Sequence, residues 1–207
     1  MCLHACGRIA AVPCRPHQTR TAALATYRLA IVVGSNRRDS INRKLAEAMA
    51  RLLPDTFEVS YPRIDDLPMY NLDLETGRPA EVDRFTSEIA AADAVAVVMP
   101  EHNRSLPAVL KNAIDWGSKP MPSNVWRGKP VSITGTTPGA IGTAVGQQHL
   151  RQILGILGAV VQGGEAYIQF KPDLIGADGD FTSADTRAFL QAYVDGFVDL
   201  VTRLVPR

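Results

Sequence analysis

The chain has 207 residues, an apolar content of 46% and a formal net charge of +1. A chain of this length is expected to form one domain with a core of its own. The near-neutral charge argues against partners such as nucleic acid or a membrane surface. No apolar run approaches the length of a membrane span, and we expect a cytoplasmic protein.

The three cysteines lie within the first fourteen residues, so the rest of the chain has no thiol for catalysis, a disulfide or a metal site. Near the N-terminus a metal could in principle be bound, but the spacing matches no standard zinc pattern and we expect none. The side chains concerned are Cys2, His4, Cys6, Cys14 and His17. Residues 1–26 have arginines and no acids, a composition that resembles a transit segment. We interpret residues 1–26 as a disordered extension and residues 27–207 as the domain.

Strand and helix patterns alternate along the domain. Short apolar segments bounded by turn residues predict strands over residues 27–33, 56–61, 94–99, 130–135 and 159–162. Apolar residues at helical spacing predict helices over residues 41–52, 81–92, 106–116, 142–155 and 182–204. Residues 63–79, rich in Asp, Pro, Asn and Gly, predict a loop with one short helical turn.

This alternation predicts an α/β fold with a parallel sheet covered by helices on both faces. Five strands, with a polar turn after the first, favour the flavodoxin-like doubly wound sheet of order 2-1-3-4-5. In that architecture a ligand lies beyond the carboxyl ends of strands one, three and four. The three most polar turns of the sequence follow those strands.

The first of these turns joins the strand over residues 27–33 to the next helix. It reads Gly34-Ser35-Asn36-Arg37-Arg38-Asp39-Ser40-Ile41-Asn42. Backbone N–H groups at a helix start, hydroxyl donors and a cation are the groups that bind a phosphate. The alternative is an ordinary turn, since such turns favour Ser, Asn, Asp and Gly. No Walker loop and no Gly-x-Gly-x-x-Gly fingerprint is present.

The second and third turns are suited to a flat ring. The second turn, between Pro100 and Pro107, exposes the backbone at the sheet edge, and its alternative reading is that Glu101 and Asn103 only cap the next helix. We place Pro107 inside the first turn of that helix. The third turn, residues 135–142, is rich in glycine and allows close approach to a ligand, although a plain strand-to-helix turn would have the same composition. One turn for a phosphate and two for a ring predict a mononucleotide with a planar head, such as FMN.

The sequence also resembles a known family, the NAD(P)H-dependent FMN reductases, a flavodoxin-like group that includes bacterial chromate and quinone reductases. The resemblance covers residues 27–201. The matching segments are residues 34–42, 100–116 and 129–139.

The resemblance implies a role for each turn. The residues implied to hold the FMN phosphate are Ser35, Arg37, Ser40, Ile41 and Asn42. Those implied to border the isoalloxazine ring and the ribityl chain are Pro100, Glu101, His102 and Asn103. Those implied to close the other edge of the ring are Thr136, Thr137, Pro138 and Gly139. His102 stands where the family usually has Tyr, so stacking, substrate access or flavin potential is expected to differ here.

The implied activity is transfer of a hydride from NADPH, or NADH, through flavin N5 to an acceptor. The acceptor is a small molecule: a quinone, chromate, an azo compound or free flavin. The flavin performs the chemistry, so we assign no catalytic side chain, and His102 is a candidate substrate contact. The alternatives are a flavodoxin-like electron carrier, against which the near-neutral charge counts, and a non-catalytic flavin-binding module.

The family resemblance also implies a homodimer or homotetramer in which a neighbouring subunit helps to form the flavin pocket. The helix over residues 106–116 and Trp126, which we expect to be exposed, are the candidate subunit contacts.

Overall fold

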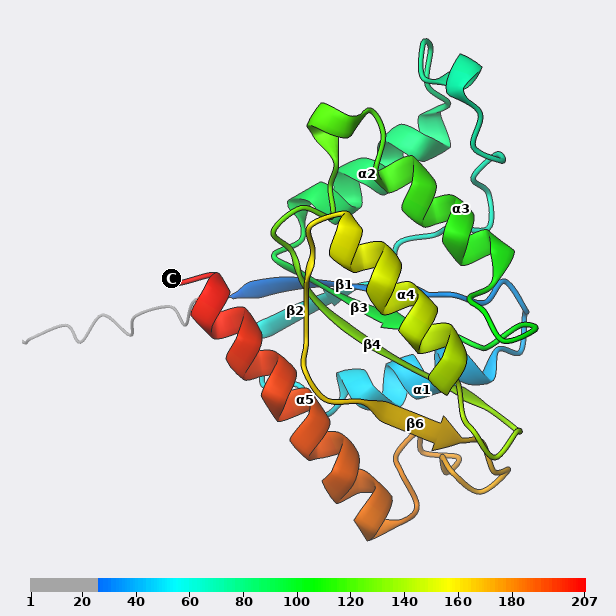
Figure 1. The fold of residues 1–207 in the computed structure, drawn as a ribbon. Coiled ribbons are helices and arrows are strands. Elements are labelled where there is room, and N and C mark those ends of the chain that lie inside the picture. The colour runs from blue at the N-terminus through cyan, green and yellow to red at the C-terminus, as the bar shows by residue number, and fades with distance from the viewer. Residues whose placement is uncertain (1–25) are drawn as a thin grey trace, which may run out of the picture.

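A parallel sheet runs through the centre of residues 26–207, the part of the chain that the computed structural model describes (Figure 1). The predicted extension, residues 1–26, and the Cys and His side chains considered there as metal ligands lie outside the described residues, apart from Thr26. None of the helices formed by residues 26–207 combines the length and the apolar content needed to cross a membrane.

The sheet has the predicted flavodoxin-like order, β2-β1-β3-β4-β5, and each neighbouring pair is parallel. Its strands are β1 (Tyr27–Val33), β2 (Phe57–Ser60), β3 (Ala94–Val98), β4 (Pro130–Thr137), β5 (Val160–Val161) and β6 (Ala166–Gln169). This order confirms the predicted fold class.

The fifth position of the sheet differs from the prediction, because two strands share it. Both β5 and β6 pair with β4, and the sequence Gln162-Gly163-Gly164-Glu165 separates them. Because β6 pairs with the end of β4, β4 continues through Thr137 and does not end at Gly135 as predicted.

A side chain completes the hydrogen bonding of β4 between β5 and β6. The Ile133 N–H donates to the hydroxyl of Tyr193 over 3.2 Å, and that hydroxyl donates to the Ile133 carbonyl over 2.7 Å. Burial raises the pKa of Tyr193 to about 12. The phenol thus takes the place of a neighbouring strand at one residue.

The helices lie within a few residues of their predicted positions. They are α1 (Ile41–Ala50), α2 (Ala80–Ala91), α3 (Ala108–Gly117), α4 (Ala144–Ile156) and α5 (Ala184–Leu204). The short 3₁₀ helices are η1 (Leu72–Leu74), which is the turn predicted within residues 63–79, and η2 (Met121–Ser123). Serine side chains cap two of the helices: Ser40 begins α1 and Ser183 begins α5.

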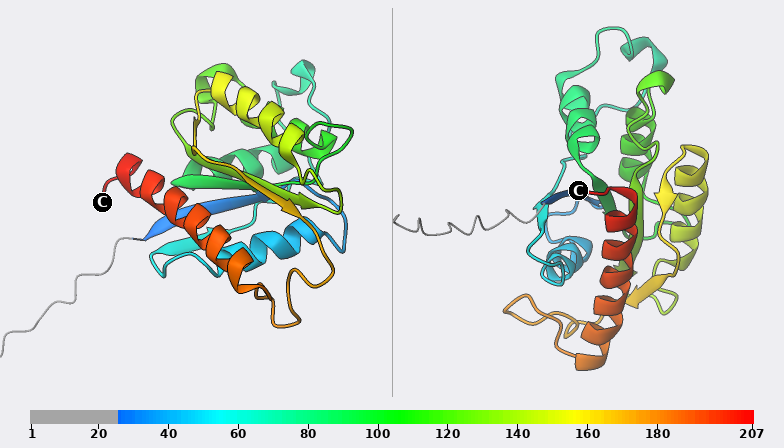
Figure 2. Two further views of the ribbon diagram at one scale, coloured as in Figure 1. Left: turned by 60° about the horizontal axis from the view of Figure 1, so that its bottom comes forward. Right: turned by 90° about the vertical axis from the view of Figure 1, so that its left-hand side faces the viewer.

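Two apolar cores separate the helices from the sheet. Helices α1 and α5 cover one face, and α2, α3 and α4 cover the other (Figure 2). Alternate side chains of β1 enter opposite cores, Ala30 and Val32 one and Leu29 and Ile31 the other, as expected for a strand buried on both faces.

Trp126 is buried, so the prediction of an exposed tryptophan was wrong. Only 1% of its surface is accessible, and its indole Nε1 donates to the Ile114 carbonyl over 3.1 Å. Gly117 allows this packing, because a Cβ there would lie 2.5 Å from Trp126 Nε1. Trp126 is therefore part of the core and is no candidate for a subunit contact.

Candidate functional site

An open cleft lies where β1, β3 and β4 end at the carboxyl rim of the sheet. We call it the rim cleft, and its volume is about 280 Å³. Its lining residues are Gly34, Ser35, Asn36, Arg37, Ser40, Ile41, Asn42, Pro100, Glu101, His102, Pro107, Val109, Thr136, Thr137 and Pro138. The three polar turns of the sequence therefore meet in space, as expected for parallel strands of this order.

The first turn is packed closely against the end of β3. The Gly34 N–H donates to the Val98 carbonyl over 2.8 Å, and a Cβ on Gly34 would lie 2.8 Å from Met99 Cβ. Glycine is therefore required at the start of this turn for steric reasons. The turn is anchored at one end and is exposed from Asn36 to Asp39.

Unpaired N–H donors lie at the start of α1. Ser40 Oγ accepts from the N–H of Arg43 over 3.2 Å and so caps the third position of the helix. The N–H groups of Ile41 and Asn42 have no acceptor among the described residues. Together with the positive end of the helix dipole and the exposed Arg37, they are groups that could hold an anion.

The side chain of Asn42 connects two of the turns. Asn42 Nδ2 donates to the Thr136 carbonyl over 3.0 Å, and Asn42 Oδ1 accepts from the Thr136 N–H over 2.9 Å. Asn42 is 1% exposed, and both polar atoms of its side-chain amide are hydrogen-bonded to Thr136. Its side chain fixes the start of α1 against the end of β4.

The second turn is a tight hairpin. The backbones of His102 and Ser105 bond to each other in both directions over 2.9 Å. Between them, Asn103 and Arg104 have φ values of 50° and 64°, as in a type I′ turn. Two successive non-glycine residues in the left-handed region carry backbone strain, which tends to occur where a loop has a functional role.

The alternative that Glu101 and Asn103 only cap the next helix was wrong. Pro107, which we predicted inside the first turn of α3, stands at its N-cap, and no side chain caps that helix. Glu101 caps a different helix: its Oε2 accepts from the Gly146 N–H of α4 over 2.9 Å. Arg104 lies 3.5 Å from the other oxygen of Glu101, so this buried carboxylate is balanced by a cation and by a helix N-terminus.

The third turn begins later than predicted, because Thr136 belongs to β4. Thr136 is fully buried, and its hydroxyl donates to the Ile168 carbonyl of β6 over 2.9 Å. Thr137 and Pro138 line the rim cleft beyond it. The Pro138 carbonyl accepts from the Gln169 side chain over 3.1 Å, which connects the turn to β6.

The rim cleft contains all the residues predicted for the site except Asn103 and Gly139. Asn103 lies at the tip of the hairpin, and Gly139 follows Pro138 away from the cleft. Four lining residues were not predicted as site residues: Gly34, Asn36, Pro107 and Val109. All four lie inside the segments that matched the family, residues 34–42 and 100–116.

Residues 27–173 match the family described as NADPH-dependent FMN reductase. Among curated proteins, a 2-hydroxy-1,4-benzoquinone reductase of Burkholderia sp is 45% identical over 171 residues, which is 82% of this chain and 93% of that protein. A quinone reductase of Pseudomonas putida is 45% identical over 177 residues, 84% of this chain and 95% of that protein.

Among solved structures, the flavoenzyme NAD(P)H:(acceptor) oxidoreductase FerB of Paracoccus denitrificans has a TM-score of 0.83 and 42% sequence identity. The similarity covers 86% of this chain and 98% of FerB. The chain is thus similar to these proteins both in sequence and in structure over the region that contains the rim cleft.

Proposed function

We propose that this chain, which belongs to the NADPH-dependent FMN reductase family, reduces a quinone with electrons from NAD(P)H through FMN held in the rim cleft. Family membership makes it an oxidoreductase that uses FMN and NAD(P)H. One observation carries the proposal for the site. The turn with donors for an anion and the two turns suited to a flat ring line the same cleft. The quinone follows from the activities for which the relatives are named.

The donors of the first turn fit the phosphate of FMN. The N–H groups of Ile41 and Asn42, the hydroxyls of Ser35 and Ser40 and the guanidinium of Arg37 would hold it. The chemistry that FMN supplies when bound is two-electron transfer between NAD(P)H and an acceptor.

The second and third turns fit the flavin ring. Pro100, Val109 and Pro138 offer apolar surface in the lining of the rim cleft. The volume of about 280 Å³ lies near the lower limit of cofactor pockets, which is about 300 Å³, so part of a ring would stay accessible to a second substrate. His102 lies at the exposed side, where its imidazole would donate a hydrogen bond to a quinone oxygen.

We also propose a cytoplasmic homodimer or homotetramer. Exposed apolar side chains occur on the turn before α4 and at its end: Ile141 is 49% exposed and Ile156 is 85% exposed. A subunit contact that covers these side chains would remove apolar surface from water. Light scattering should give a mass of two or four chains, and a monomer at micromolar concentration would contradict this proposal.

The purified protein tests the main proposal directly. It should be yellow, should lose flavin absorbance on anaerobic addition of NADPH, and should regain it on addition of a benzoquinone. Bleaching without recovery would leave the flavin site intact and exclude quinone reduction. A colourless protein that does not take up added FMN would exclude the site itself.

One arginine tests the phosphate site. Arg37→Ala should weaken FMN binding by roughly 1.5–3 kcal/mol, because one charge-assisted contact is lost. Arg203→Ala, which removes an exposed arginine of α5 far from the rim cleft along the chain, is the control and should leave the FMN affinity unchanged. An equal affinity in both variants would contradict the role of Arg37.

The histidine of the hairpin tests the acceptor side. His102→Ala should raise KM for the quinone while leaving the dissociation constant of FMN within about two-fold, because the imidazole is proposed to contact the acceptor. His102→Tyr should restore the lower KM if a hydrogen-bond donor there is sufficient. A loss of FMN affinity alone would assign His102 to the cofactor and not to the acceptor.

A further inference from the structure

A second cleft lies on the other side of the first turn. We call it the arginine cleft, and its volume is about 320 Å³. It shares Ser35, Asn36, Arg37 and Ser40 with the rim cleft, so one exposed turn forms a wall of both. A ligand whose phosphate binds at this turn can therefore extend from one cleft into the other.

The arginine cleft carries more positive charge than the rim cleft. Arg37, Arg38, Arg43 and Arg63 line it together with one acid, Asp65. Arg43 is paired with Glu47, and Arg63 is paired with Asp65. Arg37 and Arg38, in contrast, form no ion pair with any residue in the described part of the chain. The unpaired charge suits a second phosphate next to the one at the turn.

The far wall offers the groups that an adenosine needs. Arg43 lies 4.0 Å above the ring of Tyr61 and so fixes its orientation, while Pro62 adds apolar surface beside it. The Tyr61 hydroxyl has no hydrogen-bond partner among residues 26–207, and burial raises its pKa, so it remains a donor. A hydrogen bond from Arg63 lowers the pKa of Asp65, which keeps that carboxylate ionised as an acceptor for ribose hydroxyls or an exocyclic amine.

We propose that the arginine cleft is an adenylate subsite, and that the chain accepts the dinucleotide FAD in place of FMN. The flavin and its phosphate occupy the rim cleft and the first turn, the second phosphate of the pyrophosphate binds Arg38, and the adenosine lies against Tyr61. This inference rests on the proposed FMN site, since the subsite begins where the phosphate of FMN ends.

Binding measurements on the purified chain after removal of its bound flavin, by quenching of flavin fluorescence, test the inference without reference to activity. FAD should bind with a dissociation constant within about ten-fold of that of FMN. Arg38 lines only the arginine cleft, so Arg38→Ala should weaken FAD binding by about ten-fold and change FMN binding by less than about two-fold. Arg203→Ala, the control, should change neither.

Two substitutions at Tyr61 distinguish the loss of adenosine contacts from a loss of folding. Tyr61→Phe keeps the ring and should lose only the hydroxyl contact, a reduction of FAD affinity of a few-fold. Tyr61→Ala should lose about ten-fold in FAD affinity with the FMN affinity retained, and the retained FMN affinity shows that the variant is folded.

Several results would overturn the inference. FAD that binds more than about a hundred-fold more weakly than FMN would exclude the subsite. Equal weakening of both flavins by Arg38→Ala would make the arginine cleft a part of the FMN site. A higher KM for NADPH but not for NADH in Arg38→Ala, with FAD affinity unchanged, would assign the cleft to a ribose phosphate. Failure of FMN itself to bind would defeat the proposed function, whereas binding of FMN without FAD defeats only this inference.

Discussion

The two faces of the sheet are packed in different ways. The face covered by α2, α3 and α4 holds both tryptophans of the chain, Trp116 and Trp126, each fully buried. Each indole donates to a backbone carbonyl, Trp116 to Pro68 over 2.7 Å and Trp126 to Ile114 over 3.1 Å. Two large buried rings with satisfied polar atoms thus pack into this face.

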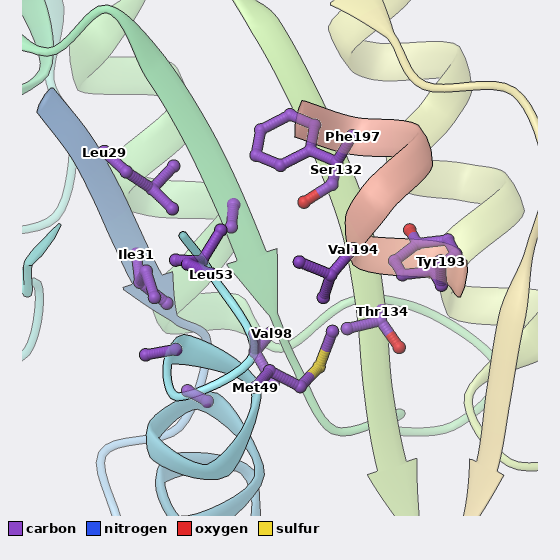
Figure 3. Close-up of a pocket in the computed structure, with 13 residues that line it drawn as sticks. Leu29, Ile31, Met49, Leu53, Val98, Ser132, Thr134, Tyr193, Val194 and Phe197 are labelled. Atoms are coloured by element: carbon purple, nitrogen blue, oxygen red, sulfur yellow. The ribbon is translucent and has the colours of Figure 1, made fainter. Parts of the chain in front are cut away.

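The face covered by α1 and α5 is packed less completely. A gap of about 30 Å³ remains between the two helices and the sheet (Figure 3). In that view the side chains of Met49, Val194 and Phe197 border the gap together with the hydroxyl-bearing Ser132 and Thr134. The helix that presents the phosphate turn, α1, therefore lies on the more loosely packed face.

One face of the sheet thus holds two large buried indoles, while the other holds the buried hydroxyl of Tyr193 and unfilled space. Substitutions on the two faces should therefore have different costs.

The largest effect is expected from removing a tryptophan. Trp126→Ala should lower the free energy of unfolding by about 3–5 kcal/mol, because the indole is enclosed by Gly117, Phe85 and the backbone of α3. Phe197→Ala, on the other face, should cost less, because neighbours around the existing gap can move into the vacated volume. Urea denaturation of both variants measures this, and a larger cost for Phe197→Ala would reverse the comparison.

The second-largest effect on stability is expected from removing one hydroxyl. Tyr193→Phe keeps the ring but leaves the N–H and the carbonyl of Ile133 without their partner between β5 and β6. Two buried backbone groups without hydrogen bonds should cost roughly 3 kcal/mol. Hydrogen exchange at Ile133 should accelerate in the variant, and unchanged exchange would show that β4 does not depend on the phenol.

The same phenol predicts how stability depends on pH. The folded pKa of Tyr193 is about 12 against an ordinary value of 10.0, so its contribution to stability is complete below pH 10 and is lost as the pH rises toward 12. The loss should reach at most about 2.7 kcal/mol. Urea denaturation between about pH 9 and pH 12 should show this decline in the wild type relative to Tyr193→Phe. Parallel curves for the two proteins would contradict it.

The features that could be predicted from the sequence depend on local patterns, and those that could not depend on long-range contacts. The strand order and the position of the rim cleft depend on alternation of elements and on turns after β1, β3 and β4, and these are local patterns. Trp126 lies between polar and turn residues, so it looked exposed, and only its packing on Gly117 determines that it is buried.

The roles of Asn42 and β6 could not be predicted for the same reason. The partner of the Asn42 side chain, Thr136, is 94 residues away, so no local pattern indicated that this side chain joins two turns. Similarly, β6 is a four-residue segment whose pairing with β4 depends on the break at Gly163 and Gly164. The residues that line the rim cleft were recognisable as a group, whereas the hydrogen bonds of their side chains depend on partners far away in the sequence.

The smallest expected effect tests the comparison most directly, because adding one methylene should change the stability of the fold in opposite directions on the two faces. Val194→Ile adds one methylene at the gap beside α1 and should stabilise the fold by about 0.5–1 kcal/mol. Val97→Ile adds the same group to the filled face, where Val97 is 1% exposed, and should destabilise it by about 1 kcal/mol or more. Urea midpoints at equal m-values measure both changes. If both variants lose stability, the gap closes without the added group, and the two faces are equally tightly packed in solution.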